Sequence, residues 1–412
     1  MAGDDSPAGA VGAPATSDGR MPASSLRRLQ ATTFVSAFDR MAIVPLLVLI
    51  GAGFDASLSQ VTLAATAYFV LYGVGQPFWG VMTDRFGRVR VLRVTLAGAA
   101  VAAAASALAP SLATLVVARG VAGLLFGAAV PTGLVYIGDT VAVRHRQPAL
   151  ADLMAATASG LAVAAAVAGL VAGAIGWRAV FALAAVAALG LVFALRDLPE
   201  PVTEPRGPAL ATVRELLSSP WPLVVLGLVL VEGAVGVGLI TFFAPALQDS
   251  GVGVASAGLV MALYGASVLG WTRAVKSVVA RSAPATLIGV GGTFFAASYL
   301  VAWTDPAVTG IGAAAVLSAG GYAFMHSSLQ TWATQVAAEL RATMISLFAG
   351  CLFLGGGIAT AVAAPLAGDG DFTTVFALGG LVAVPLGIAA TLARRRFDRG
   401  GPDAPGSAAG FG

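Results

Sequence analysis

The chain has 412 residues, of which 58% are hydrophobic and only 10% charged, and its formal net charge is +3. A soluble domain carries roughly 25% charged residues, so this composition excludes a water-soluble fold and indicates a protein that lies in a lipid bilayer. One cysteine and two histidines exclude a disulfide within the chain and argue against a Cys/His metal cluster, so we expect no metal and no cofactor.

Long apolar runs follow one another along the chain without the two-residue alternation of barrel strands, so they predict helices. About 20 residues cross a hydrocarbon core of roughly 30 Å. The runs of that length lie at residues 30–50, 61–82, 92–110, 113–137, 150–174, 177–195, 221–247, 254–272, 284–303, 307–330, 343–367 and 372–393. The predicted fold class is therefore all-α integral membrane, with twelve transmembrane helices.

The longest polar interval divides the spans into six and six, which predicts two bundles. The expected organisation is a disordered cytoplasmic tail (1–29), an N-terminal six-helix bundle (30–195), a cytoplasmic linker (196–220), a C-terminal six-helix bundle (221–393) and a second cytoplasmic tail (394–412). We expect a monomer in which the two bundles face each other.

Short matches between the halves predict an internal repeat. LYG at 71–73 recurs at 263–265, an offset of 192, and VFAL at 180–183 recurs at 375–378, an offset of 195. Several matches at nearly one offset place helix on corresponding helix. Two related bundles with a site near the middle of the membrane suit transport by alternating access.

The basic residues predict the orientation. If the N-terminus lies inside, every lysine and arginine except Arg40, Arg119 and Arg178 falls in a tail or link on the inner side. The positive-inside rule then places both termini in the cytoplasm and the chain in the cell membrane as a multi-pass protein. Because the arginines fill these inner links, we expect no nucleic acid as a partner.

The link between the second and third spans is crowded with charge between apolar runs. It reads GVMTDRFGRVRV, with a pattern formed by Gly80, Asp84, Arg85, Gly87, Arg88 and Arg90. Gly87 permits a tight turn, and Asp84 can accept charge-assisted hydrogen bonds. The link resembles the signature loop of the major facilitator superfamily, and the chain is most similar to its twelve-helix drug and sugar efflux branch, the drug:proton antiporter-1-like branch. The resemblance implies a cytoplasmic gate loop that latches the halves in the outward-facing state.

Two more patterns carry the resemblance. Arg119 with Ala122 and Gly123 is similar to the superfamily's arginine-containing motif in helix four. Residues 160–178 keep the glycines of the helix-five motif of proton-antiporting exporters but lack its proline. The equivalent loop of the second half, 270–281, keeps the cations but lacks the aspartate and the second glycine, so we expect a weaker latch there.

Ionisable residues inside the spans are the candidate site. Asp39, Arg40, Arg119 and Glu232 each cost roughly 2.5–3.5 kcal/mol at the centre of a membrane helix, and they persist where they pair or line water. Asp39 and Glu232 belong to the first helices of the two halves, so we expect both carboxylates and Arg40 to form a proton-coupling site. Adjacent residues face about 100° apart, so Asp39 and Arg40 each need a partner. Arg119 is a structural anchor or the relay partner of Asp39.

His326 is a further candidate for the coupling site, and its alternative is a buried interior residue without such a role. Side chains expected to line the cavity are Tyr72, Gln76, Tyr322 and Gln330. Asp139 and Asp152, near the inner ends of their spans, are expected to pair with arginines of the gate.

The expected function is secondary active transport by alternating access, with proton-coupled efflux of a small amphipathic drug, sugar or metabolite. The partners are then the lipid bilayer, the small-molecule substrate and protons. Proton-linked uptake of a nutrient stays open, because the motifs do not fix a direction. A non-transporting membrane receptor is a remote alternative. The spans hold no nucleophile–base pair, which argues against an enzyme, and the chain has no Walker-type loop for ATP-driven transport.

Overall fold

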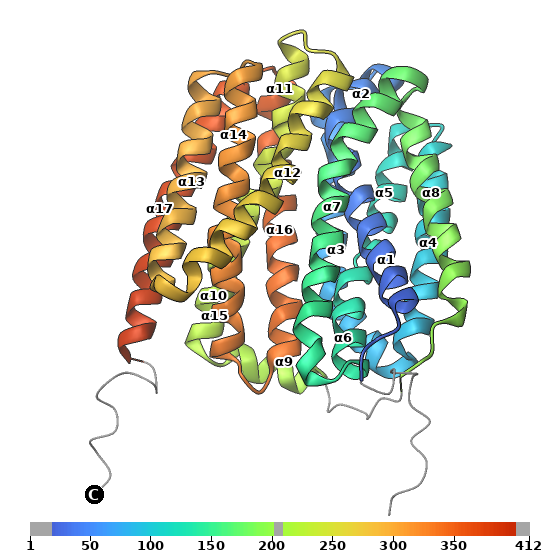
Figure 1. The fold of residues 1–412 in the computed structure, drawn as a ribbon. Helices are drawn as coiled ribbons and strands as arrows, with labels where there is room; N and C mark the ends of the chain where they lie inside the picture. The colour runs from blue at the N-terminus through green and yellow to red at the C-terminus, as the bar shows by residue number, and fades with distance from the viewer. Residues whose placement is uncertain (1–18, 202–208, 401–412) are drawn as a thin grey trace, which may run out of the picture.

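The computed structural model describes residues 19–201 and 209–400, and in these ranges every regular element is helical (Figure 1). The N-terminal half contains α1 (Ala23–Ala42), α2 (Leu47–Phe54), α3 (Leu58–Phe86), α4 (Arg88–Ala107), α5 (Leu112–Phe126), α6 (Ala129–Thr140), α7 (Val143–Ile175) and α8 (Trp177–Ala194). The C-terminal half contains α9 (Ala209–Leu217), α10 (Pro220–Gly233), α11 (Phe243–Asp249), α12 (Val254–Val278), α13 (Pro284–Thr304), α14 (Val308–Gly321), α15 (Ser327–Val336), α16 (Arg341–Gly368) and α17 (Phe372–Gly400).

These helices form twelve candidate membrane spans, one for each predicted apolar run. Most are longer than the predicted runs, because a helix can continue past the hydrocarbon core. α1 begins at Ala23, inside the segment predicted as a disordered tail, and α17 continues to Gly400. The predicted linker contains one further helix, α9. The rest of the predicted tails, 1–18 and 401–412, and residues 202–208 lie outside the described residues.

The two halves form two bundles side by side, blue to green and yellow to red in Figure 1. Small residues let the helices of different bundles approach closely. A Cβ atom added to Gly73 of α3 would lie 2.8 Å from the carbonyl oxygen of Gly350 in α16. One added to Gly169 of α7 would lie 2.7 Å from the carbonyl oxygen of Val254 in α12. The bundles therefore meet along α3–α16 and α7–α12 through glycine-lined contacts.

Four spans are interrupted near their middle, and they are related in pairs by the internal repeat. The first span breaks at a 3₁₀ turn (Val44–Leu46), and the seventh breaks at a π-helical turn (Ala234–Gly238) followed by a 3₁₀ turn. The fourth breaks between α5 and α6, and the tenth at a π-helical turn (Tyr322–His326). Such irregular backbone inside a membrane is tolerated where it is buried in protein or lines a cavity.

Side chains from neighbouring helices satisfy the carbonyl groups that the break in the fourth span releases. Trp79 donates its indole N–H to the carbonyl of Leu124 at 2.6 Å, Gln76 donates to that of Gly127 at 3.1 Å, and Ser36 donates to that of Phe126 at 2.9 Å. The break is therefore a fixed feature of the packed bundle.

α1 begins and α17 ends at the same end of the molecule, the lower end in Figure 1. Contacts between Arg28 and Asp197, and between Arg88 and Asp139, lie at this end. We call it the arginine-rich end. The basic-residue pattern predicts that it faces the cytoplasm.

Candidate functional site

A small cavity of about 50 Å³ lies between the bundles. Its wall takes residues from both halves, namely Arg40, Met41, Phe69, Leu161, Gly236, Val237, Ile240, Thr241, Tyr264, Tyr322, Leu352 and Phe353. The interrupted backbone of the seventh span supplies much of this wall, and the π-helical turn of the tenth span supplies Tyr322. A buried water needs about 10–15 Å³, so the cavity has room for a few waters. Its lining is mainly apolar, with Arg40 as its cation.

Arg40 connects the two halves. Its Nη1 donates to the Tyr72 hydroxyl at 3.2 Å, and its guanidinium lies 4.9 Å from the ring centre of Phe353 in α16. It also lies 5.3 Å from the ring centre of Tyr72. Tyr72, predicted as a lining residue, therefore orients Arg40, while Phe353 gives it a contact in the other bundle.

Asp39 and Arg119 form a closed ion pair inside the N-terminal bundle. Arg119 Nη1 donates to Asp39 Oδ1 and Nη2 donates to Oδ2, each at 2.9 Å, and both side chains are fully buried. The rings of Tyr68 and Phe181 lie 4.6 and 4.7 Å from the guanidinium carbon. In this two-pronged geometry each carboxylate oxygen accepts one hydrogen bond from Arg119, and Asp39 does not line the cavity. Arg119, expected to be a structural anchor or the relay partner of Asp39, is therefore in direct contact with it.

Glu232 lies in the C-terminal bundle, one helical turn before the cavity-lining segment of the seventh span. It is fully buried, and its Oε2 lies 3.3 Å from His326 Nδ1. Its Oε1 has no hydrogen-bond partner within the described part of the chain. The His326 ring stacks on Tyr322, with centres 4.4 Å apart and planes at 13°. Contacts thus run from Glu232 through His326 to Tyr322 at the cavity wall.

The expectation that both carboxylates and Arg40 form one cluster needs a correction. Asp39 faces Arg119, whereas Arg40 faces the cavity, because adjacent helix residues point about 100° apart. Glu232 is held by His326 in the other bundle. The site therefore consists of two separate carboxylate pairs, one per bundle, with Arg40 at the interface between them.

Two other predicted lining residues differ from expectation. Gln76 is buried, and its amide is occupied by the Gly127 carbonyl, so it supports the break in the fourth span. Gln330 is exposed, one turn beyond the π-helical turn that carries His326. Their positions follow from the helix phase, which the apolar pattern alone does not set when a span is apolar on all sides.

The predicted gate loop forms a charge cluster at the arginine-rich end. Arg88 is buried and contacts Asp84 at 2.7 Å and Asp139 at 3.1 Å, and it donates to the carbonyl of Thr83 at 2.5 Å. The predicted pairing of Asp139 with a gate arginine is therefore confirmed. The ion pairs of Arg88 lie within the N-terminal bundle. Gly80 faces the other bundle, where a Cβ atom would lie 3.4 Å from Ser346 Oγ.

Other predicted gate residues are more exposed. Arg85 lies over the neighbouring Phe86 ring at 5.3 Å, and Arg90 is exposed. Asp152, in α7, is also exposed. Within the described ranges these three side chains make no ion pair, so the predicted pairing of Asp152 with a gate arginine is absent there.

Glu200 is a gate-loop partner that sequence reasoning missed. Its carboxylate accepts hydrogen bonds from the backbone N–H groups of Val89 and Arg90 at the start of α4, at 3.0–3.1 Å. A Cβ atom on Gly87, whose φ is +94°, would lie 2.7 Å from the Glu200 carboxyl carbon. Glycine is therefore needed here for two reasons. It adopts the positive φ of the turn, and it leaves room for the Glu200 carboxylate. The feature of the sequence that could have indicated this contact is an acidic residue just after the sixth span, because the third span begins with backbone N–H groups that its own N-cap residue, Gly87, cannot satisfy.

Twelve membrane-length helices in two bundles, with paired interruptions around a cavity between them, define the architecture of a secondary transporter. The family model of the Major Facilitator Superfamily matches residues 30–360. The chain belongs to this superfamily.

Curated relatives match parts of the chain. A triacylglyceride transporter of Mycolicibacterium smegmatis is 33% identical over 129 residues, which are 31% of this chain and 23% of that protein. An efflux pump, dotC, of Dothistroma septosporum is 28% identical over 186 residues, which are 44% of this chain and 32% of that protein. The alignments therefore span less than a third of either relative.

Solved structures share the fold over nearly the whole chain. A bacterial homologue of the lysosomal transporter Spinster, in an inward-facing conformation, gives a TM-score of 0.73 at 20% identity and covers 90% of this chain and 97% of its own. A D-xylose–proton symporter gives a TM-score of 0.75 at 16% identity and covers 89% and 96%. At these identities the likeness is one of fold.

Proposed function

We propose that the protein is a proton-coupled transporter that exports small amphipathic compounds from the cytoplasm by alternating access. The observation that carries the proposal is the buried Glu232–His326 pair, which reaches the inter-bundle cavity through Tyr322. A buried carboxylate beside a histidine brings a proton acceptor and a ring nitrogen that can donate or accept a proton into direct contact.

The coupling follows from a difference in stability between two conformations. Protonation of Glu232 removes a buried negative charge and changes its contact with His326. The ring of His326 packs on Tyr322, so this change reaches the surface that substrate occupies. A proton shifts the equilibrium between the inward and outward states by the difference between its binding free energies in the two states.

Asp39 and Arg119 have a different role in this proposal. Arginine stays charged at all relevant pH values, so Asp39 always faces a cation. With both side chains fully buried and doubly hydrogen-bonded, the pair stabilises the packing of α1 on α5. Glu232 is therefore the coupling residue, and Asp39 the structural one.

The cavity lining supports an amphipathic substrate. Phe69, Phe353 and Ile240 offer apolar surface, whereas Arg40 and the hydroxyl of Thr241 offer polar contacts. A molecule with an apolar body and one hydrogen-bond-accepting or acidic end matches the chemistry of this lining, and the cavity of about 50 Å³ must widen in another conformation to admit it. Export is supported by the partial similarity to an efflux pump.

The test uses the whole protein in proteoliposomes with an imposed pH gradient. Glu232→Gln should abolish gradient-driven accumulation but keep substrate exchange without a gradient, since exchange needs no net proton movement. Glu215→Gln, which changes an exposed carboxylate on α9, is the matched control and should behave as the wild type. Gradient-driven transport by Glu232→Gln at the wild-type rate would remove Glu232 from the mechanism.

Uptake of a nutrient is distinguished by the direction of substrate movement. An exporter raises the resistance of cells that overproduce it to a toxic substrate. An importer instead supports growth on its substrate or raises sensitivity to a toxic one. The same pH-gradient experiment, with the gradient reversed, gives the direction in vitro.

A further inference from the structure

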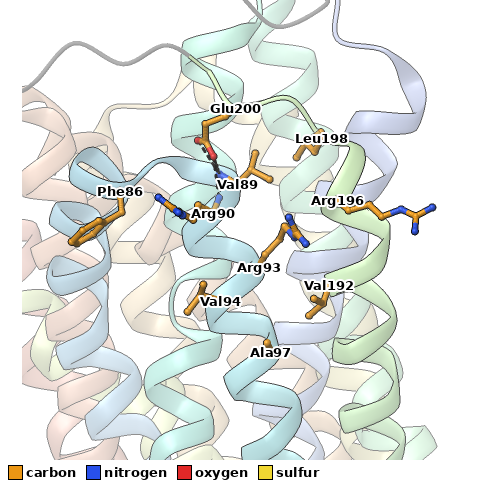
Figure 2. A pocket seen from close by; sticks show the side chains of 10 residues that line it. All are labelled: Phe86, Val89, Arg90, Arg93, Val94, Ala97, Val192, Arg196, Leu198 and Glu200. Carbon is orange, nitrogen blue, oxygen red and sulfur yellow. Dashed lines mark hydrogen bonds between the residues drawn. The ribbon is translucent and has the colours of Figure 1, made fainter.

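A groove of about 670 Å³ lies on the outer face of the N-terminal bundle, between α4 and α8 at the arginine-rich end. Figure 2 shows Arg93 between the two helices, with Arg90 and Arg196 on either side of it. Val94, Ala97 and Val192 lie below them, further along the helices (Figure 2). The groove thus has a cationic rim and an apolar floor.

The groove opens toward the surrounding bilayer rather than toward the other bundle. α4 and α8 lie at the edge of the molecule in Figure 1, and the contacts between bundles are made by α3 and α7. Below the groove the outer surfaces of both helices are apolar and exposed, with Val101 at 70% and Val186 at 69%. In a membrane these surfaces face acyl chains.

The rim has more arginine side chains than carboxylates that could pair with them. Arg90 and Arg93 make no ion pair with any residue in the described ranges. Arg196 lies 3.4 Å from Asp197, an exposed carboxylate that also lies 3.5 Å from Arg28. The remaining carboxylate, Glu200, accepts hydrogen bonds from the start of α4. The guanidinium groups of Arg90 and Arg93 are therefore available to an anion, and Arg196, which shares the exposed Asp197 with Arg28, keeps N–H donors for one.

We infer that this groove binds the headgroup of an anionic phospholipid. The phosphate is held at Arg93 and Arg196, and the acyl chains run down the apolar faces of α4 and α8. Arginine suits a phosphate because its planar fork can donate two parallel hydrogen bonds. Basic side chains at the cytoplasmic surface attract anionic lipids, and the predicted orientation places the rim there.

The groove favours an anionic lipid over a zwitterionic lipid or a free anion. A choline headgroup would bring a further cation next to three arginines. A free phosphate would use the rim but leave the apolar floor uncovered. A bound lipid would also contact both the start of α4, through Arg90, and the segment after α8, through Arg196.

The experiment measures lipid retention by the full-length protein in detergent, by native mass spectrometry. Dioleoylphosphatidylglycerol and dioleoylphosphatidylcholine are titrated separately onto delipidated protein. The wild type should retain the anionic lipid in preference. Arg93→Gln/Arg196→Gln should weaken that binding about 30-fold, since each basic side chain at a membrane surface contributes about a factor of five.

The matched control is Arg395→Gln/Arg396→Gln, which removes two exposed arginines from the same end of the molecule, on α17. It should leave retention of the anionic lipid unchanged. The substituted arginines are all exposed, so thermal unfolding should confirm that both variants fold as the wild type does. Equal retention of the two lipids by the wild type, or equal loss in the two variants, would overturn the proposal. Displacement of the lipid by inorganic phosphate at comparable concentration would assign the rim to a free anion and also overturn it.

Discussion

Trp79 and Trp271 occupy equivalent positions in the two bundles and make the same hydrogen bond. The indole of Trp79 donates to the carbonyl of Leu124 at 2.6 Å, and that of Trp271 donates to the carbonyl of Val316 at 3.0 Å. Donors and acceptors are both separated by the offset of 192 that relates LYG at 71–73 to LYG at 263–265. The repeat therefore preserves a particular contact as well as the helix count.

This symmetry makes the differences between the halves informative. At the same offset Arg40 corresponds to Glu232, and Tyr72 corresponds to Tyr264. Arg40 and Tyr264 line the cavity, while Glu232 lies behind it against His326. One scaffold position thus carries a cation in one bundle and a carboxylate in the other.

The Asp39–Arg119 pair makes a prediction about stability. Asp39→Asn leaves a buried guanidinium without its counter-charge, and we expect a loss of about 3–5 kcal/mol in the free energy of unfolding. Asp39→Asn/Arg119→Gln removes both charges and should recover part of that loss. Thermal unfolding in detergent, analysed as a double-mutant cycle, measures the coupling between the two side chains.

The same variants test the structural role assigned to Asp39. The doubly neutral protein should keep gradient-driven transport in proteoliposomes where it is folded. If it folds and exchanges substrate but no longer responds to a pH gradient, Asp39 belongs to the coupling site, as the sequence alone suggested.

His326 makes a prediction about pH dependence. His326→Phe keeps an aromatic ring on Tyr322 but removes the nitrogen that contacts Glu232, so initial transport rates between about pH 5 and 8 should depend on pH less than those of the wild type. His326→Ala removes the ring as well and should also weaken substrate binding. Initial rates measured across that range give both effects, and His145→Phe at the arginine-rich end serves as control. A wild-type pH profile for His326→Phe would contradict the role of the pair.

Arg40 makes a prediction about substrate binding. Arg40→Lys keeps the charge but loses the guanidinium contact with the Phe353 ring, and Arg40→Gln loses both. A cation–π contact contributes about 0.5–2 kcal/mol, so the KM should rise severalfold for lysine and further for glutamine. Arg178→Gln, which removes a similar contact with Trp177 outside the cavity, should leave the KM unchanged. An equal effect of Arg40→Gln and Arg178→Gln would mean that Arg40 contributes only to packing.

Gln248 makes a prediction about the conformational equilibrium. At the end opposite the arginine-rich end, its amide donates to the carbonyl of Pro45 at 3.0 Å and so joins α11 to the broken first span. Loss of one such bond costs about 1 kcal/mol. Gln248→Ala should therefore shift the population about fivefold toward the state that is open at this end.

The shift can be measured as a distance distribution between spin labels at Leu108→Cys and Val308→Cys, after Cys351→Ser. Both label positions are exposed and belong to different bundles. Gln60→Ala, which removes an amide that caps its own helix, is the control and should leave the distribution unchanged. An unchanged distribution for Gln248→Ala would show that this bond does not hold the end closed.

The sequence by itself determined the class of fold, because a chain with so few charges and runs of about 20 apolar residues has no other way to satisfy its backbone in a bilayer. It also identified the repeat, the gate loop and the charges inside the spans, since each is a departure from an apolar background. The tertiary structure decided how those charges are paired. Helix phase and the interruptions of the first, fourth, seventh and tenth spans placed Asp39 against Arg119 and Glu232 against His326. Contacts between residues 80 to 111 positions apart, such as these and the cap that Glu200 provides for α4, depend on packing geometry that no local pattern encodes.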